Sequence, residues 1–172
     1  MNTFIAVIAV TAFSLTGVSQ LTARSINVRF LDSKGEKAGQ ANITEAERGG
    51  VLIRLKVRGL PPGEHAAHIH EKPMCEGPAF TSAGGHFNPD HKQHGLDSEA
   101  GPHAGDMVNF TVGRKGKGKA LLVNPRVNLS DAGDHSILAN GGTSLMIHAT
   151  KDDMQTDPAG NAGARIACGV IK

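Results

Sequence analysis

The chain contains a series of short runs in which apolar and polar residues alternate. The clearest is Val51-Leu-Ile-Arg-Leu-Lys-Val57, and Ser25–Leu31 follows the same pattern. Alternation with a period of two is typical of a β-strand that has one buried and one solvated face. No segment keeps an apolar period of 3.6 residues, so we expect little helix.

Turn-forming residues separate these runs, since the sequence has 22 glycines and 8 prolines. Further strands are expected at 39–44, around His68-Ile69-His70, and at 107–112, 119–123, 145–148 and 164–171. About eight short strands joined by Gly/Pro turns predict an all-β sandwich or barrel. A chain of 172 residues suits one such domain with a single hydrophobic core.

The first twenty residues carry no charged side chain and centre on a short apolar run. This run is short for a bilayer span and matches the core of a signal peptide. We therefore predict a signal peptide at 1–23, cleaved at about 19–23, and an exported domain at 24–172. The expected location is the periplasm, the cell envelope or the extracellular space. A retained N-terminal anchor or a buried first strand is the alternative.

The charge and the cysteines narrow the function classes. A formal net charge of +2, without an arginine-rich or aromatic-interleaved patch, argues against a nucleic-acid partner. Cys75 and Cys168 are the only cysteines, and export would allow them to form a disulfide. Two buried free thiols are the alternative. No CxxC motif is present, so a thioredoxin-type redox role is not expected.

Histidines are concentrated in the middle of the chain, where seven of the nine lie between His65 and Asp106. Neutral imidazole is the commonest protein ligand for a borderline metal ion. On a strand, His68 and His70 project from the same face, so both can reach one ion. The other candidate ligands lie in a Gly/Pro-rich loop or on a distant strand: His86, His94, His103, Asp106 and His148. Together they predict a metal site with nitrogen and oxygen ligands.

Not every histidine is expected to be a ligand. A single histidine on a strand is more often a hydrogen-bonded core or surface residue. We expect a structural hydrogen-bonding role for His65 and surface positions for His91 and His135. Asp153 is expected to be solvated or to cap a turn.

Several stretches resemble the copper/zinc superoxide dismutase family: HAAHIHE, SAGGHFNP, HKQHG, PHAGDM and GNAGARIACGVI. The resemblance covers the chain from about Ser25 to Lys172. It implies an eight-stranded Greek-key β-barrel or sandwich with long metal-binding loops. It also implies one copper and one zinc ion per subunit, and the disproportionation of superoxide to dioxygen and hydrogen peroxide. It leaves the oligomeric state open, with a homodimer as one outcome, and implies no stable membrane insertion after leader removal.

The resemblance also implies residue roles. The copper ligands would be His68, His70, His86 and His148, and the zinc ligands would be His86, His94, His103 and Asp106. His86 would bridge the two ions and, with Arg165, form the catalytic pair; Arg165 would guide the anion. Asp152 would link the two sites, and Cys75 would pair with Cys168.

Two other functions compete with this interpretation. One is a non-catalytic copper/zinc binding or delivery module on the same fold. The other is a zinc hydrolase, which no Ser/His/Asp pattern supports. Cys75 follows His70 by only five residues, as in bacterial-type members, and the segment between Asp152 and Arg165 contains no lysine.

Overall fold

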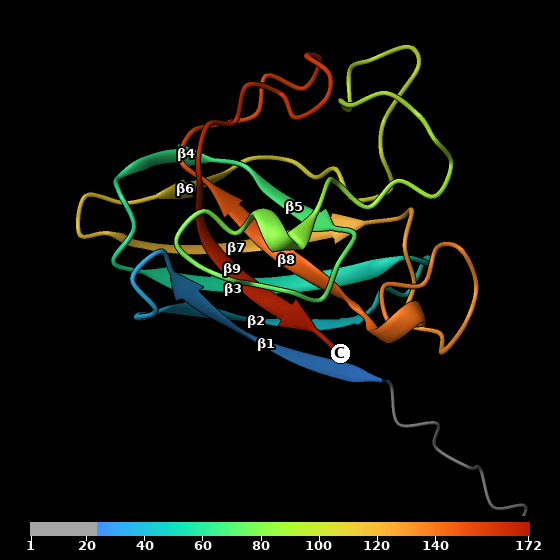
Figure 1. The fold of residues 1–172 in the computed structure, drawn as a ribbon, viewed down its shortest axis with the longest axis horizontal. Helices are drawn as coiled ribbons and strands as arrows, with labels where there is room; N and C mark the ends of the chain where they lie inside the picture. The colour runs from blue at the N-terminus through green and yellow to red at the C-terminus, as the bar shows by residue number, and fades with distance from the viewer. Residues whose placement is uncertain (1–23) are drawn as a thin grey trace, which may run out of the picture.

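The computed structural model describes residues 24–172, and they form a nearly closed β-barrel (Figure 1). The predicted signal peptide lies outside the described residues. The nine strands are β1 (Ser25–Asp32), β2 (Lys37–Glu45), β3 (Val51–Arg58), β4 (Gly63–His65), β5 (Ala67–His70), β6 (Phe110–Val112), β7 (Lys117–Asn124), β8 (Thr143–His148) and β9 (Arg165–Ile171). The described helical structure consists of two 3₁₀ turns, η1 (Thr81–Ala83) and η2 (Ala139–Gly141). None of the helices in residues 24–172 has the length and apolarity needed to cross a bilayer.

The sheet order is β4-β6-β7-β3-β2-β1-β9-β8-β5, and every paired neighbour is antiparallel. The two ends of this order, β4 and β5, are joined by Ala66 alone. The all-β prediction is confirmed, with nine strands in place of about eight. The extra strand arises because the chain changes partner at Ala66, from β6 before it to β8 after it.

Alternation in β3 produces the inner wall as predicted. Val51, Ile53, Leu55 and Val57 are buried in the core, whereas the intervening residues point outward. Ile53 lies opposite Ile43 of β2, so apolar side chains from neighbouring strands meet inside the barrel. Burial of these aliphatic side chains stabilises the fold by about 1.5–3 kcal/mol each.

Strands β5 and β8 are buried on both faces. One face contributes Ile69, Leu145 and Ile147 to the core. The other face, which carries His68 and His70, is covered by the connections at 71–109 and 149–164. This double burial places imidazoles outside the barrel core and still away from water.

A disulfide fastens the 71–109 connection to the barrel. Cys75 and Cys168 are joined, with their Cα atoms 5.6 Å apart. Phe80, Ala83 and Met146 pack around the bridge in a small apolar cluster of their own.

One expected strand is shorter than its apolar sequence suggests. The run predicted at 107–112 is a strand only from Phe110 onward. The Asn109 side chain donates to the Asp152 carbonyl at 2.9 Å and accepts from the Asp152 N–H at 2.8 Å. These contacts tie the segment to the distant 149–164 connection.

Candidate metal centre

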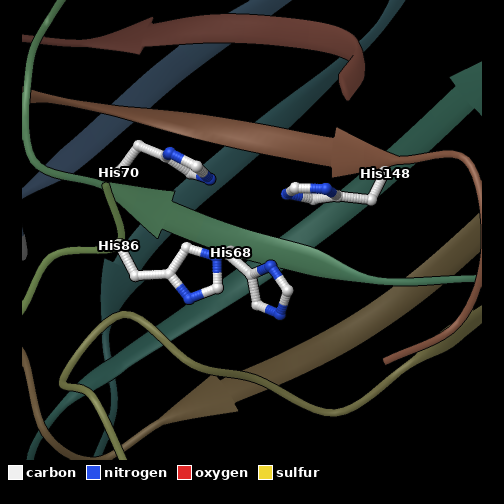
Figure 2. Close-up of side chains that lie close together, drawn as sticks. All are labelled: His68, His70, His86 and His148. Atoms are coloured by element: carbon white, nitrogen blue, oxygen red, sulfur yellow. The ribbon is translucent and has the colours of Figure 1, made fainter. Parts of the chain in front are cut away.

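Four histidines from three separate segments meet at one point (Figure 2). His68 and His70 come from β5, His148 ends β8, and His86 comes from the 71–109 connection. One ring nitrogen from each lies within 4.8 Å of the others, and all four residues are buried. We call this set the four-histidine group.

The inward ring nitrogens of this group have no hydrogen-bond partner. The unpartnered buried atoms are His68 Nδ1, His70 Nε2, His86 Nε2 and His148 Nε2. A buried polar nitrogen without a partner costs about 1–3 kcal/mol. Four of them facing one another therefore fit a metal ion that accepts four imidazole lone pairs.

The opposite ring nitrogens fix which lone pair faces inward. His70 Nδ1 donates to the Gly84 carbonyl at 3.0 Å, and His148 Nδ1 lies 3.3 Å from the Gly163 carbonyl. His68 Nε2 donates to Asp152 Oδ2 at 2.7 Å. Because a neutral imidazole carries one proton, these bonds leave the inward nitrogens deprotonated and able to bind a metal.

Burial also keeps these rings neutral. It lowers the pKa of His70 to about 2 and the pKa values of His86 and His148 to about 4, and it lowers the pKa of His68 as well. Metal binding requires neutral imidazole, so protons do not compete for these nitrogens at neutral pH.

A second group adjoins the first and contains His86, His94, His103 and Asp106, all buried. Asp106 Oδ1 lies 2.8 Å from His86 Nδ1, 3.0 Å from His94 Nδ1 and 3.5 Å from His103 Nδ1. Burial opposes the charge of Asp106, but hydrogen bonds from the three histidines outweigh it and hold the pKa of this carboxyl far below its usual range. Three imidazoles and one carboxylate form a donor set that zinc accepts.

His86 belongs to both groups. Its Nε2 is the unpartnered atom in the four-histidine group, and its Nδ1 faces Asp106 in the second. Backbone pairing positions it, because His70 and His86 form a β-bridge and the next residue, Phe87, donates to the Ile69 carbonyl. One ring can therefore contact two ions at once.

Asp152 connects the two groups through the remaining ring nitrogens. Its carboxylate accepts from His68 Nε2 at 2.7 Å and from His94 Nε2 at 3.0 Å, and the residue is 2% exposed. Both nitrogens are already hydrogen-bonded, so Asp152 is a link between ligands and not the centre of a third metal site. Burial opposes the charge of His94, but its bonds to Asp106 and Asp152 outweigh that effect and raise its pKa to about 9.

Gly160 leaves room for this carboxylate. Its φ of +62° is in the left-handed region, and a Cβ there would overlap the Asp152 side chain. Only glycine fits both the backbone conformation and the space.

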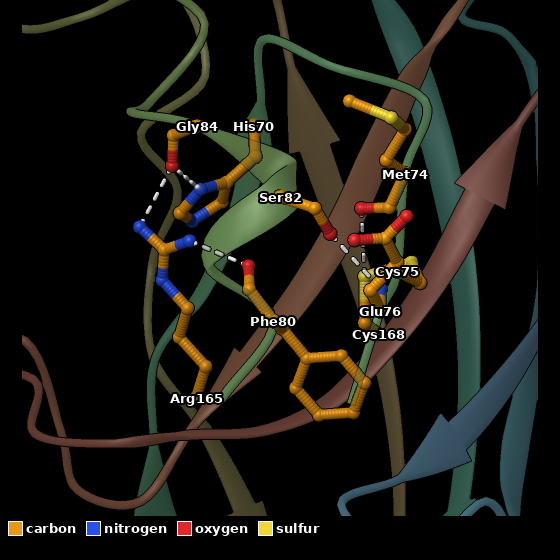
Figure 3. The surroundings of a disulfide bond; sticks show 9 residues. All are labelled: His70, Met74, Cys75, Glu76, Phe80, Ser82, Gly84, Arg165 and Cys168. Atoms are coloured by element: carbon orange, nitrogen blue, oxygen red, sulfur yellow. Dashed lines mark hydrogen bonds between the residues drawn. A yellow bond between two sulfur atoms is a disulfide. The ribbon is translucent and has the colours of Figure 1, made fainter. Parts of the chain in front are cut away.

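Arg165 lies beside His70 of the four-histidine group (Figure 3). It donates through Nη1 to the Phe80 carbonyl at 2.8 Å and through Nη2 to the Gly84 carbonyl at 2.7 Å. The Gly84 oxygen also accepts from His70, so it joins the arginine to a candidate metal ligand. Burial lowers the pKa of Arg165, but a guanidinium stays charged in proteins, and its charge helps to lower the pKa of His70 and His148.

The remaining histidines lie outside both groups. The two ring nitrogens of His65 each lie 2.8 Å from a backbone carbonyl, those of His148 and Pro61. His91 is exposed, and His135 bonds to the Arg126 carbonyl and to Asp90. The site thus gathers the ligand candidates of the sequence analysis and leaves these three out.

Two contributors carry no signal in the sequence that singles them out. Asn109 holds the Asp152 backbone, and Arg126 donates to the carbonyl of Asp106. Both hold an aspartate of the site through its main-chain atoms, so their residue types do not resemble metal ligands. Only the tertiary contact reveals them.

Comparison with known proteins agrees with this geometry. The family model described as copper/zinc superoxide dismutase (SODC) matches residues 37–171. Superoxide dismutase [Cu-Zn] 1 of Aquifex aeolicus (strain VF5) is 50% identical over 144 residues, covering 83% of this chain and 85% of that protein.

Solved structures show the same fold. A SOD-like protein from Bacillus subtilis superposes with a TM-score of 0.82 at 37% identity, covering 85% of this chain and 97% of that one. The Cu/Zn superoxide dismutase from Brucella abortus gives a TM-score of 0.71 at 31% identity, covering 87% and 100%. The chain belongs to the copper/zinc superoxide dismutase family.

Proposed function

We propose that this protein disproportionates superoxide to dioxygen and hydrogen peroxide at a copper ion held next to a structural zinc ion. The copper ligands are His68, His70, His86 and His148, and the zinc ligands are His86, His94, His103 and Asp106. The observation that carries the proposal is the set of four buried, unpartnered ring nitrogens that face one another. Family membership supports the same donor sets and the same reaction.

The chemistry divides between the two ions. Copper supplies one-electron redox chemistry, since it has two accessible oxidation states, whereas zinc has no redox chemistry and orders its ligands. His86 would hold zinc through Nδ1, which faces Asp106, and copper through its unpartnered Nε2. When Nε2 holds no metal, it can take up a proton from solvent and pass it to the peroxide product, which needs protons to leave as hydrogen peroxide.

Arg165 binds the anionic substrate. Two carbonyl oxygens fix the guanidinium in place and leave further N–H donors for a small anion. Its position near His70 and His148 brings that anion beside the copper ligands. Asp152 orients His68 and His94 and so fixes the position of the two ligand sets relative to each other.

Two variants test these roles. His148→Ala is expected to abolish most superoxide turnover while one zinc per chain is retained, because His148 belongs to the four-histidine group and not to the group of His86, His94, His103 and Asp106. Arg165→Ala is expected to keep both metals and slow the reaction with superoxide. Metal content by atomic spectroscopy and superoxide turnover by pulse radiolysis measure the two effects. Unchanged turnover in both variants would show that the residue roles are wrong.

A non-catalytic copper/zinc module remains distinguishable from the enzyme. Wild-type protein loaded with one copper and one zinc per chain should show bleaching and recovery of its copper absorption when superoxide is added. Tight metal binding without that cycle would favour the binding or delivery module.

We further propose that residues 1–23 direct export and are removed. The disulfide supports export, because disulfides persist in oxidising compartments outside the cytosol. Mass spectrometry of the exported protein should find a chain that begins after residues 19–23. An intact N-terminus on exported protein would contradict cleavage.

A further inference from the structure

The outward face of β1, β2, β3 and β7 is strongly basic. We call it the basic face; its exposed cations are Arg29, Lys37, Arg54, Lys56, Arg58, Lys117 and Lys119. The outward positions between them on these strands carry neutral side chains. Carboxylates border this face in Asp32, Glu36 and Glu45, and in Glu64 of β4, a strand separated from β7 only by β6. A chain with a formal net charge of only +2 thus places seven of its 18 lysines and arginines on one wall of the barrel.

Cations on this face are placed directly opposite one another. Lys56 of β3 pairs in register with Lys119 of β7, and Arg58 pairs with Lys117. Like charges at directly opposed positions destabilise a sheet. Within residues 24–172, none of the ion pairs formed by Lys or Arg involves these four side chains. An anion from outside the chain would therefore reduce the repulsion between these cations.

Exposed aliphatic side chains share this face with the cations. Leu31, Leu121 and Val123 are 41%, 62% and 54% exposed, and Leu121 lies opposite Arg54. Exposed aliphatic side chains beside cations suit a binding partner whose surface offers both charged groups and an apolar layer.

The basic face lies on the wall opposite the metal groups. In the nearly closed ring, β3 and β2 are four strands away from β5, which carries His68 and His70. In Figure 1, β1 and β2 run along the lower side of the barrel, and residues 149–164 rise above it. A partner on the basic face would leave the metal centre accessible.

We propose that the basic face docks this protein on a membrane surface rich in anionic phospholipids. The lipid phosphates would neutralise the opposed cations, and Leu121 and Val123 would enter the apolar layer beneath the headgroups. A groove lined by Arg29, Lys37, Lys56 and Arg58 offers space for a phosphate headgroup. A soluble polyanion would satisfy the charges and leave the aliphatic side chains in water, so the combination favours a membrane. This inference does not depend on the proposed reaction.

Co-sedimentation of the full metal-loaded chain with vesicles tests the proposal. Binding is expected to vesicles of phosphatidylglycerol and phosphatidylcholine, to be much weaker to phosphatidylcholine alone, and to fall when NaCl is raised to about 0.5 M. Residues 1–23 carry no charged side chain, so they should not distinguish the two lipid compositions.

A matched pair of variants isolates the face. The double variant Lys56→Gln/Lys119→Gln should bind the anionic vesicles about 30-fold more weakly, since each basic side chain near an anionic leaflet contributes about a factor of five. The control Lys72→Gln/Lys92→Gln removes the same charge from exposed positions in the 71–109 connection and should bind like the wild type. Equal binding by the two double variants would overturn the proposal.

The aliphatic residues separate a membrane from a soluble polyanion. Leu121→Ser/Val123→Ser should weaken vesicle binding and leave binding to dextran sulfate unchanged. If this variant binds vesicles like the wild type, the basic face takes a soluble polyanion and the membrane proposal is wrong. Thermal unfolding gives a further readout, because removing the like-charge pair should not lower the melting temperature of Lys56→Gln/Lys119→Gln.

Discussion

Replacing Gly160 by alanine should loosen the link between the two metal groups. The added Cβ would overlap Asp152 Oδ1 and lie 2.7 Å from His94 Nε2. The carboxylate oxygen would have to retreat by more than about 1 Å to reach ordinary van der Waals contact. Its 3.0 Å hydrogen bond to His94 would then exceed the range of a real hydrogen bond.

The magnitude follows from the role of that bond. Loss of the partner that orients a metal-binding histidine typically costs about 10- to 100-fold in metal affinity. That range corresponds to about 1.4–2.8 kcal/mol of binding free energy. The backbone adds a second cost, since alanine at φ +62° lowers the free energy of unfolding by about 1–2 kcal/mol.

Gly59→Ala is the matched control. Gly59 has a similar φ of +70°, and a Cβ there would meet no atom within 4 Å. Both variants should therefore carry the backbone cost, and only Gly160→Ala should lose zinc affinity. Chelator competition measures that affinity, and denaturant unfolding of the metal-free protein measures stability. If Gly160→Ala holds zinc as tightly as Gly59→Ala, Asp152 does not orient His94 in the way we describe.

Three further predictions address stability. Cys75→Ser/Cys168→Ser should lower the free energy of unfolding by up to about 4–5 kcal/mol, because the bridge spans 93 residues; a loss below about 1 kcal/mol in denaturant unfolding would contradict this. The metal-free protein should be most stable near pH 7. Below that pH the unfolded chain takes up protons that His70, His86 and His148, with pKa values of about 2 to 4, do not bind in the folded protein; as the pH rises toward 9, the stabilising proton on His94 is lost. Unfolding at pH 5, 7 and 8.5 checks this, and a flat profile would refute it. Asn109→Ala should cost about 1–3 kcal/mol and weaken metal binding, whereas a variant that only loses stability would show that Asn109 does not position Asp152.

The alternation of apolar and polar residues predicts where the strands are, but it does not predict which strands pair. The pattern in Val51–Val57 gave the inner wall correctly, because burial of one face depends only on the period of the side chains. No sequence pattern marks the break between β4 and β5 at Ala66, because the break arises from a change of partner strand. At 107–109, apolar composition favoured a strand, and the tertiary contact of Asn109 with Asp152 decided otherwise.

The candidate site shows the same division. The paired histidines of β5 were recognisable because a strand places alternate side chains on one face. The ring nitrogen that faces inward was not recognisable, because the carbonyls of Gly84 and Gly163 determine it. The space that Gly160 leaves for Asp152 likewise exists only once the 149–164 connection has folded over β5.

The Gly84 carbonyl couples metal binding to substrate binding. This one oxygen orients the His70 ring and positions the Arg165 guanidinium, so a change at Gly84 alters both. Insertions between Cys75 and Phe80 could be absorbed before they reach this atom. A single added residue between Phe80 and Gly84 would disturb both the capture of the anion by Arg165 and the electron transfer at the copper ligand His70. Natural length variation in the 71–109 connection should therefore fall before Phe80.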